Sequence, residues 1–254
     1  MTDILPAILP KNFAELQEKL GRVKGLADGV QIDICDGRFV PSKTWPYVFS
    51  SSPPSRGGVP SPRGGVVGEA IAEKDPNFQA IVNEKEGFPF WDSFDFEFDL
   101  MVHEPEGVIG DYVKAGASRI VLHVESTKVL SEIIHEWQHS VILSLAASIE
   151  TPLSVFADFA HHVKDFQLMG IAKIGAQGQA FDERVIERVR ELKKLYPEHT
   201  ITVDGGVSLE TALSLLDAGA TRLVVGSALF KSENIADTIE QLKHCDAAST
   251  RGEN

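Results

Sequence analysis

The stretch TITVDGGV, from Thr200 to Val207, decides the fold. Its apolar residues alternate, which is typical of a short strand, and the strand ends in an acid followed by two glycines. A carboxylate at the end of a strand can lie over a bound ligand, while glycine N–H groups approach a phosphate with no Cβ in the way. The stretch therefore predicts a ligand-binding strand end at Asp204, Gly205 and Gly206.

Two other stretches have the same form. GVQIDICDG, from Gly29 to Gly37, is an apolar strand that ends in acids and a glycine, and RLVVGS, from Arg222 to Ser227, ends in Gly-Ser. Because parallel strands place their carboxyl ends at one edge, the three strand ends are expected at the mouth of one barrel.

The rest of the chain alternates strand and helix patterns. Strands are expected at 4–9, 30–35, 95–102, 119–125, 141–146, 166–172, 201–203 and 223–225, and helices at 13–24, 77–85, 104–115, 130–139, 153–163, 182–195, 209–218 and 234–243. In the sixth of these helices, Asp182 is expected as the cap and Leu195 as an inward residue. Eight strands and eight helices in 254 residues predict an α/β fold, a single-domain (β/α)8 TIM barrel over 1–254. A doubly wound open sheet is the alternative, but its GxGxxG after the first strand is absent.

Composition excludes several classes of partner. A net charge of -13 argues against nucleic acid and against an anionic membrane, although it permits a small anionic substrate held by backbone amides. Two cysteines without a CxxC fit a reducing compartment. The first residues lack a basic, apolar leader, and no apolar run reaches a membrane-spanning length, so a cytoplasmic protein is expected.

Residues 48–74 are expected to be a disordered insertion after the second strand, and residues 246–254 a flexible tail. Within the insertion, 13 of the 16 residues from Ser50 to Gly65 are Ser, Pro or Gly, which cannot bury enough surface to offset their ordering entropy. A tolerated surface loop is the simple interpretation, and a substrate lid or partner-binding segment is the alternative.

Six segments in order resemble the ribulose-phosphate 3-epimerase family, a family of metal-dependent barrel enzymes of pentose metabolism. They are IDICDGRFVP from Ile32, FDLMVHEPE from Phe98, KAGASRIVLHVES from Lys114, GQAF from Gly178, VDGGV from Val203 and VVGSALF from Val224. The resemblance implies an isomerase that interconverts D-ribulose 5-phosphate and D-xylulose 5-phosphate, with a small phosphorylated sugar as its ligand. Barrels of this kind often form homo-oligomers, but no helix stripe here is apolar enough to name an interface.

The resemblance also implies roles for individual residues. Asp33 and Asp204 are expected as the acid/base pair, with Met101 and Met169 in the sugar pocket. The phosphate is expected at Gly175, Ala176, Gln177, Gly178, Gly205, Gly206, Gly226 and Ser227. The implied metal ligands are Asp33, Asp204 and the two residues at the family's histidine positions, which are Gln31 and Asp99 in this chain. Further departures are Ala7 in place of a serine and the stretch 172–174 in place of an asparagine and a proline.

An amide and three carboxylates form an all-oxygen set that favours Mg2+ or Mn2+, whereas Zn2+ or Fe2+ suits the family's histidines better. Three carboxylates at one site need a cation, a neutralising Lys173 or Arg38, or protons. Each residue also has a simpler interpretation: Asp33 and Asp99 as turn caps, Gln31 as a hydrogen-bonding residue inside the barrel, and His123 as a satisfied core histidine. Two other functions stay open, a related phosphosugar enzyme with another substrate and a non-catalytic phosphosugar-binding barrel.

Overall fold

The computed structural model describes residues 2–47 and 74–245, and its strands close into a barrel in chain order, β1-β2-β3-β4-β5-β6-β7-β8. All neighbouring strands are parallel, β8 to β1 included. The strands are β1 (Asp3–Ile8), β2 (Gly29–Cys35), β3 (Asp95–Met101), β4 (Ala117–His123), β5 (Ile142–Ala147), β6 (Asp165–Met169), β7 (Thr200–Asp204) and β8 (Arg222–Val225). The predicted (β/α)8 barrel and its eight strands are therefore confirmed.

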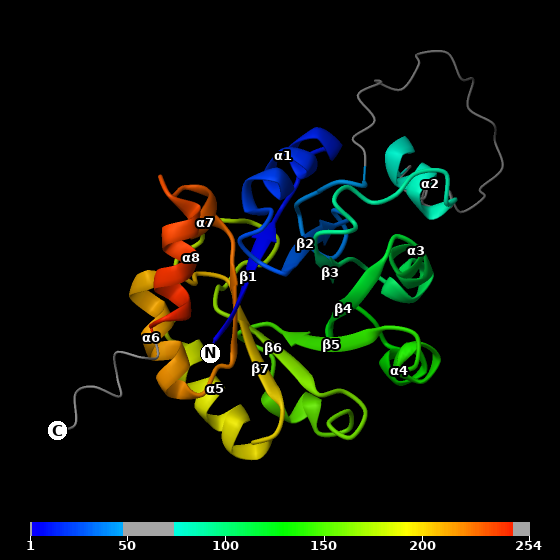
Figure 1. Cartoon of the computed structure of the whole chain (residues 1–254). Helices are drawn as coiled ribbons and strands as arrows, with labels where there is room; N and C mark the ends of the chain where they lie inside the picture. The colour runs from blue at the N-terminus through cyan, green and yellow to red at the C-terminus, as the bar shows by residue number, and fades with distance from the viewer. Residues whose placement is uncertain (1, 48–73, 246–254) are drawn as a thin grey trace, which may run out of the picture.

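Helices surround the strands on the outside (Figure 1). They are α1 (Phe13–Val23), α2 (Pro76–Val82), α3 (Ile109–Lys114), α4 (Leu130–Trp137), α5 (Arg184–Leu195), α6 (Leu209–Ala218), α7 (Ser227–Phe230) and α8 (Ile235–Lys243), with the 3-10 turns η1 (Pro105–Gly107) and η2 (Leu153–Phe156). The bounds predicted for α6, including its end at Gly219, agree with the structure. The short helix α7 was not predicted.

The helix predicted at 153–163 is wrong. Only η2 forms there, and turns follow it to residue 162. The Ala160 carbonyl accepts hydrogen bonds from the side chains of His199 and Lys164. His199 is distant from Ala160 in sequence, and a period-based prediction cannot include such a contact.

Two smaller predictions also need correction. The helix predicted at 104–115 is divided into η1 and α3, and Glu104 before it has a left-handed backbone with φ of 55°. In α5, Leu195 is 55% exposed rather than inward. Asp182 lies outside the helix, where its Oδ1 accepts a hydrogen bond from the Arg184 amide, and Glu183 is the N-cap residue.

Alternation along the strands separates two environments. Outward residues such as Ile32 and Ile34 pack into the main core between the barrel and the helices. The residues between them, Gln31, Asp33 and Cys35, are buried inside the barrel. Since successive strand residues point to opposite faces, this pattern places polar side chains in the barrel interior.

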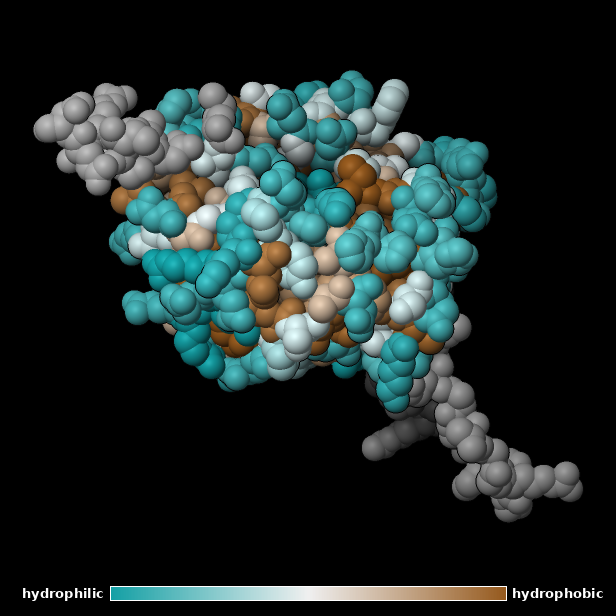
Figure 2. Space-filling view, turned by 90° about the horizontal axis from the view of Figure 1, so that it is seen from below, coloured by the Kyte–Doolittle hydropathy of each residue, from teal (hydrophilic) through white to brown (hydrophobic). Residues whose placement is uncertain are grey.

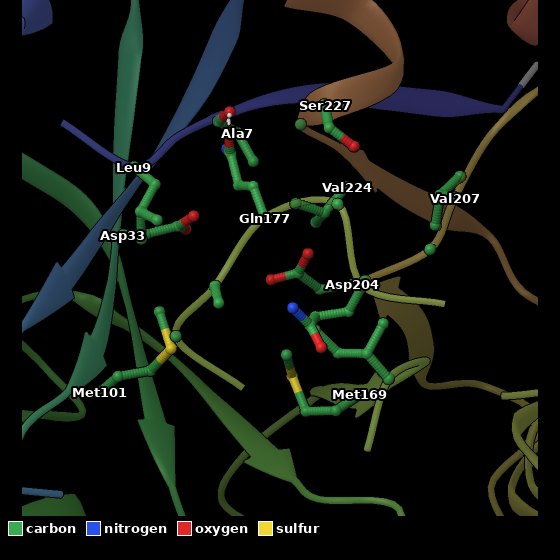
Figure 3. Close-up of a pocket in the computed structure, with 18 residues that line it drawn as sticks. Ala7, Leu9, Asp33, Met101, Met169, Gln177, Asp204, Val207, Val224 and Ser227 are labelled. Carbon is green, nitrogen blue, oxygen red and sulfur yellow. Dashed lines mark hydrogen bonds between the residues drawn. The ribbon is translucent and has the colours of Figure 1, made fainter. Parts of the chain in front are cut away.

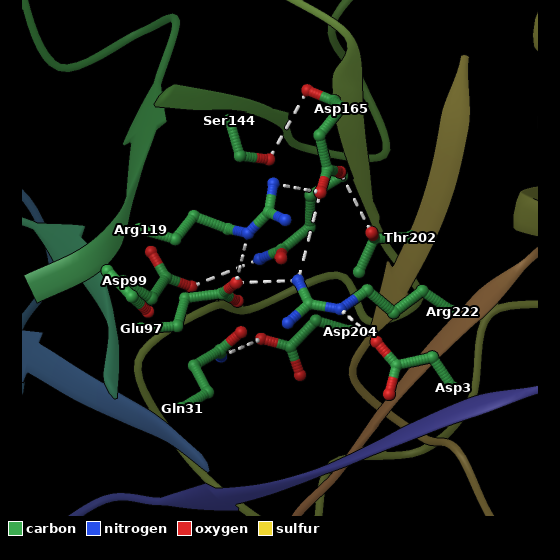
Figure 4. A network of polar contacts seen from close by, with 12 residues as sticks. Asp3, Gln31, Glu97, Asp99, Arg119, Ser144, Asp165, Thr202, Asp204 and Arg222 are labelled. Atoms are coloured by element: carbon green, nitrogen blue, oxygen red, sulfur yellow. Dashed lines mark hydrogen bonds and ion pairs between the residues drawn. The ribbon is translucent and has the colours of Figure 1, made fainter. Parts of the chain in front are cut away.

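A layer of charged side chains, of which Glu97, Asp165 and Arg222 are buried, lies towards the amino-terminal ends of the strands (Figure 4). Glu97 Oε2 lies 3.0 Å from Arg119 Nε and also contacts Arg222 Nη1. Arg119 Nη1 lies 2.6 Å from Asp165 Oδ2, and Arg222 Nε lies 2.9 Å from Asp3 Oδ2. These ion pairs fill that end of the barrel with side chains, so the opposite end is left for a ligand.

On the face seen in Figure 2, hydrophobic residues form separate patches between hydrophilic ones. No helix in the described part of the chain is both long enough and apolar enough to cross a bilayer. Of the insertion predicted at 48–74, only Lys74 is described, and its Nζ lies 2.6 Å from Asp111 Oδ2. Residues 48–73 and the tail predicted at 246–254 lie outside the described residues.

Candidate active site

Three aspartates meet inside the barrel near the carboxyl ends of their strands. Asp33 comes from β2, Asp99 from β3 and Asp204 from the last position of β7. One carboxylate oxygen of each lies within 4.8 Å of the others, and Asp99 is fully buried. The register pairs Asp33 directly with Asp99 on adjacent strands. The structure thus brings together the three acids that the sequence singled out.

Gln31 joins two of these acids. Its Nε2 donates hydrogen bonds of 2.9 Å to Asp33 Oδ1 and of 2.9 Å to Asp204 Oδ2. Its Oε1 is buried and has no hydrogen-bond partner among the described residues. Gln31 therefore hydrogen-bonds inside the barrel, as its simpler interpretation predicted. Its Oε1 atom stays available to bind a cation.

Asp99 is held by two other side chains. His123 Nε2 lies 3.0 Å from Asp99 Oδ1, and Gln167 Nε2 donates a hydrogen bond of 3.1 Å to Asp99 Oδ2. His123 is fully buried, as expected for a core histidine, and its partner is a carboxylate of the site. The sequence analysis missed Gln167, although its place between Asp165 and Met169 on an alternating strand could have indicated an inward residue.

Burial and crowding control the charges of this cluster. Burial, followed by the charges of Asp204 and Asp99, raises the pKa of Asp33 well above its usual value. Burial and the charge of Asp99 raise the pKa of Asp204 to about 7. Burial opposes the charged form of His123, but the adjacent Asp99 outweighs it and raises the pKa of the imidazole. Asp33 and Asp204 are therefore costly to ionise next to other charged carboxylates.

The neutralising side chains proposed from sequence are not at the site. Lys173 is exposed, and neither Lys173 nor Arg38 lines the cavity above the aspartates. Three crowded carboxyl groups and the unpartnered Gln31 Oε1 match the ligands that Mg2+ and Mn2+ prefer. The residues present therefore fit a hard divalent cation.

A cavity opens above Asp33 and Asp204 (Figure 3). All ten residues predicted to bind the phosphate and the sugar line it: Met101, Met169, Gly175, Ala176, Gln177, Gly178, Gly205, Gly206, Gly226 and Ser227. Gln31 and Asp99 do not line the cavity and are fully buried. The sequence analysis did not select the apolar lining residues Leu9, Ile171, Val207 and Val224, nor Gln179.

Glycine is required at two of these positions. Gly205 and Gly206 have φ of 97° and 71°, in the left-handed region. A Cβ on Gly205 would lie 2.8 Å from Ile171, and one on Gly206 would lie 2.9 Å from Phe181. The turn after β7 is therefore bare backbone next to Asp204, which is the arrangement that a phosphate group needs for close approach.

Gln177 connects the loop after β6 to the opposite wall. Its Nε2 donates a hydrogen bond of 3.2 Å to the carbonyl of Ala7 at the end of β1. The same atom would lie 2.8 Å from a Cβ on Gly226. The amide therefore rests against the Gly226 backbone inside the cavity.

The chain is similar to known proteins along nearly its whole length. Residues 82–230 match the model of the "Ribulose-phosphate 3 epimerase family". A ribulose-phosphate 3-epimerase of Schizosaccharomyces pombe is 29% identical over 95% of this chain and 92% of its own length. The one from Bacillus subtilis is 28% identical over 96% of this chain and 99% of its own.

Solved structures agree in fold at lower identity. KGPDC from Streptococcus mutans has a TM-score of 0.58 and 11% identity, over 98% of this chain and 98% of that one. A 3-hexulose-6-phosphate synthase from Salmonella typhimurium has a TM-score of 0.58 and 15% identity, over 98% of this chain and 99% of that one. The match to the family model covers more than half of the chain, so the chain belongs to the ribulose-phosphate 3-epimerase family, whose members are isomerases.

Proposed function

We propose that the protein interconverts D-ribulose 5-phosphate and D-xylulose 5-phosphate, with Asp33 and Asp204 as the proton-transferring pair. The observation that carries the proposal is that these two carboxyl groups, from β2 and β7, line the same cavity as the glycine turn after β7. The names of the relatives from Schizosaccharomyces pombe and Bacillus subtilis support the same reaction.

The reaction inverts the configuration at C3. One carboxylate removes the C3 proton, which breaks the C–H bond and leaves its electron pair in an enediolate with the neighbouring carbonyl. The other carboxyl group, in its protonated form, delivers a proton to the opposite face of C3 and forms the new C–H bond. A pair with raised pKa values suits this exchange, because near neutral pH one member can be protonated while the other is ionised.

The residues that would hold a divalent cation are Asp33, Asp99 and Asp204, together with Gln31 through Oε1. When bound, such a cation supplies positive charge that stabilises the developing enediolate. We favour Mg2+ or Mn2+ over Zn2+ or Fe2+ because every donor of the set is oxygen. His123 and Gln167 orient Asp99 in this set through their hydrogen bonds.

The remaining residues bind and orient the sugar phosphate. Met101 and Met169 form apolar walls of the cavity, and the glycine turn with Ser227 would hold the phosphate group. A cytoplasmic location fits this role, and Cys35 and Cys245 do not form a disulfide with each other.

One observation favours a second candidate, a barrel that binds phosphosugars without epimerising them. The Gln31 amide presents nitrogen, not oxygen, to Asp33 and Asp204, so these carboxylates have a hydrogen-bonding partner without a cation. In that case the phosphate site would persist and proton exchange at C3 would be absent.

Proton NMR of D-ribulose 5-phosphate in D2O distinguishes the candidates. The protein is stripped of metal and then given Mg2+, Mn2+ or Zn2+, and deuterium entry at C3 is followed together with the appearance of D-xylulose 5-phosphate. Both are expected, fastest with Mg2+ or Mn2+. If no metal gives exchange while the sugar phosphate still binds, the epimerase proposal fails and the binding barrel replaces it.

A further inference from the structure

The charge of the cavity poses a problem for a phosphorylated ligand. Its lining includes the carboxyl groups of Asp33 and Asp204 but no lysine or arginine among the described residues. The whole chain carries a net charge of -13. Backbone amides and uncharged side chains such as Ser227 would therefore have to hold a phosphate dianion close to acids that repel it.

Lys231 lies next to this cavity. It is the C-cap residue of α7, and its amide donates a hydrogen bond of 3.1 Å to the Ser227 carbonyl. Its Nζ is 3.5 Å from the point that a Cβ on Gly178 would occupy, and Gly178 lines the cavity. The Lys231 side chain thus extends from the end of α7 towards the loop after β6.

The Lys231 side chain is exposed. Within residues 2–47 and 74–245, no side chain or carbonyl forms a hydrogen bond or an ion pair with its Nζ. Some lysines are already engaged: the Lys19 ammonium lies 2.8 Å from the Glu15 carboxylate, and Lys193 donates a hydrogen bond of 2.6 Å to the Pro197 carbonyl. An exposed ammonium with no partner can bind an anion without first breaking an ion pair.

We propose that Lys231 binds the phosphate group of the substrate, as a side-chain cation at the edge of the site formed by Gly178 and Ser227. The inference extends the proposed function and rests on it for the identity of the phosphorylated sugar. Lys231 adds an attraction that depends on the phosphate charge, so it discriminates a phosphorylated sugar from the free sugar. Lys231 does not line the cavity next to Asp33 and Asp204, so it should act on binding more than on the chemical step.

The first test measures inorganic phosphate binding by calorimetry on the metal-stripped protein, which needs no turnover. Lys231→Met should weaken phosphate about tenfold, the lower end for a charge-assisted hydrogen bond, and Lys231→Arg should restore most of it. Lys194→Met, on an exposed position of α5, removes the same charge far from the cavity and is the matched control. If Lys194→Met weakens phosphate binding equally, the effect comes from the net charge of the protein and the proposal is wrong.

Lys173→Met tests the rival cation in the loop after β6. If it weakens phosphate and Lys231→Met does not, the loop lysine is the phosphate partner and the proposal is wrong. Circular dichroism of each variant shows whether the barrel is folded. If Lys231→Met does not fold, Lys231→Gln is used in its place.

The second test uses turnover. With D-ribulose 5-phosphate, Lys231→Met should raise KM about tenfold with kcat nearly unchanged, and added salt should raise the wild-type KM more than that of the variant. A fall in kcat at constant KM would contradict a phosphate-binding role. If the wild type does not epimerise this sugar, the proposed function fails, while the calorimetry still decides whether Lys231 binds phosphate.

Discussion

The side-chain amide of Gln31 donates a hydrogen bond of 2.9 Å to Oδ2 of Asp204, across the barrel from β2 to β7. The amide oxygen on the other side, Oε1, has no partner within the described residues. A turn of the amide plane exchanges its oxygen for its nitrogen. The same residue can therefore bridge carboxyl groups when no cation is present and offer an oxygen when one is.

Asp204→Asn should abolish epimerisation, with a loss of about a thousandfold or more, because an amide cannot accept or deliver the proton. Binding of inorganic phosphate should stay within a few-fold, since the glycine turn remains. Turnover is measured by NMR and phosphate binding by calorimetry. Asp217→Asn, at an exposed position of α6, is the control and should behave as wild type. Undiminished turnover in Asp204→Asn would remove Asp204 from the reaction.

The same substitution should change how stability depends on pH. Burial and the charge of Asp99 raise the pKa of Asp204 from 3.8 to about 7 in the folded protein. Between these values the folded state binds more protons than the unfolded state, so the contribution of Asp204 to stability falls as pH rises through this window. Asp204→Asn removes the ionisable carboxyl group. The substitution should therefore stabilise the metal-free protein at pH 8, by on the order of a few kcal/mol, and less at pH 5.

Urea unfolding in the presence of a chelator, at pH 5, 6.5 and 8, measures this difference. A gain that is the same at all three pH values would mean that the carboxyl group of Asp204 is not the one that titrates. Added Mn2+ should stabilise the wild type and reduce the advantage of the variant at pH 8, because the cation favours the ionised carboxylates.

Gln31→His combined with Asp99→His should shift the metal preference towards zinc. Imidazole nitrogens suit Zn2+ better than amide and carboxylate oxygens do, and the gain in Zn2+ affinity should be on the order of tenfold or more. Competition with a coloured chelator measures affinity, and the visible spectrum of bound Co2+ reports the change of donor atoms without any need for activity. Unchanged Zn2+ and Co2+ titrations would show that these two positions are not ligands.

Glu97→Gln should destabilise the barrel by about 3 kcal/mol, the scale for breaking a buried ion pair by removing one partner. Glu97 is fully buried against Arg119 and Arg222, and its loss leaves their charges without this carboxylate. Glu187→Gln breaks the exposed pair with Arg190 and should change little. Urea unfolding compares the two variants, and equal effects would mean that burial of the Glu97 network does not add to stability.

The sequence by itself determined the closed barrel, and it predicted residues that the structure brings to one cavity. Strand-length apolar patterns locate eight strands. An acidic residue or a glycine lies at or near the carboxyl ends of β2, β7 and β8, namely Asp33, Asp204 and Gly226. Such patterns can be predicted because they involve only neighbouring residues. The ten residues that the family resemblance implied for the phosphate and the sugar all line one cavity.

Only the tertiary structure decided which partners these residues have. The hydrogen bonds of Gln31 to Asp204, of His123 to Asp99 and of Gln177 to Ala7 join residues far apart in the chain, and no local pattern specifies them. The same is true of the hydrogen bond between the His199 side chain and the Ala160 carbonyl, in the segment where a helix was expected. Periodicity reports which face of a strand is buried, whereas the partner of a buried polar atom depends on how the barrel closes.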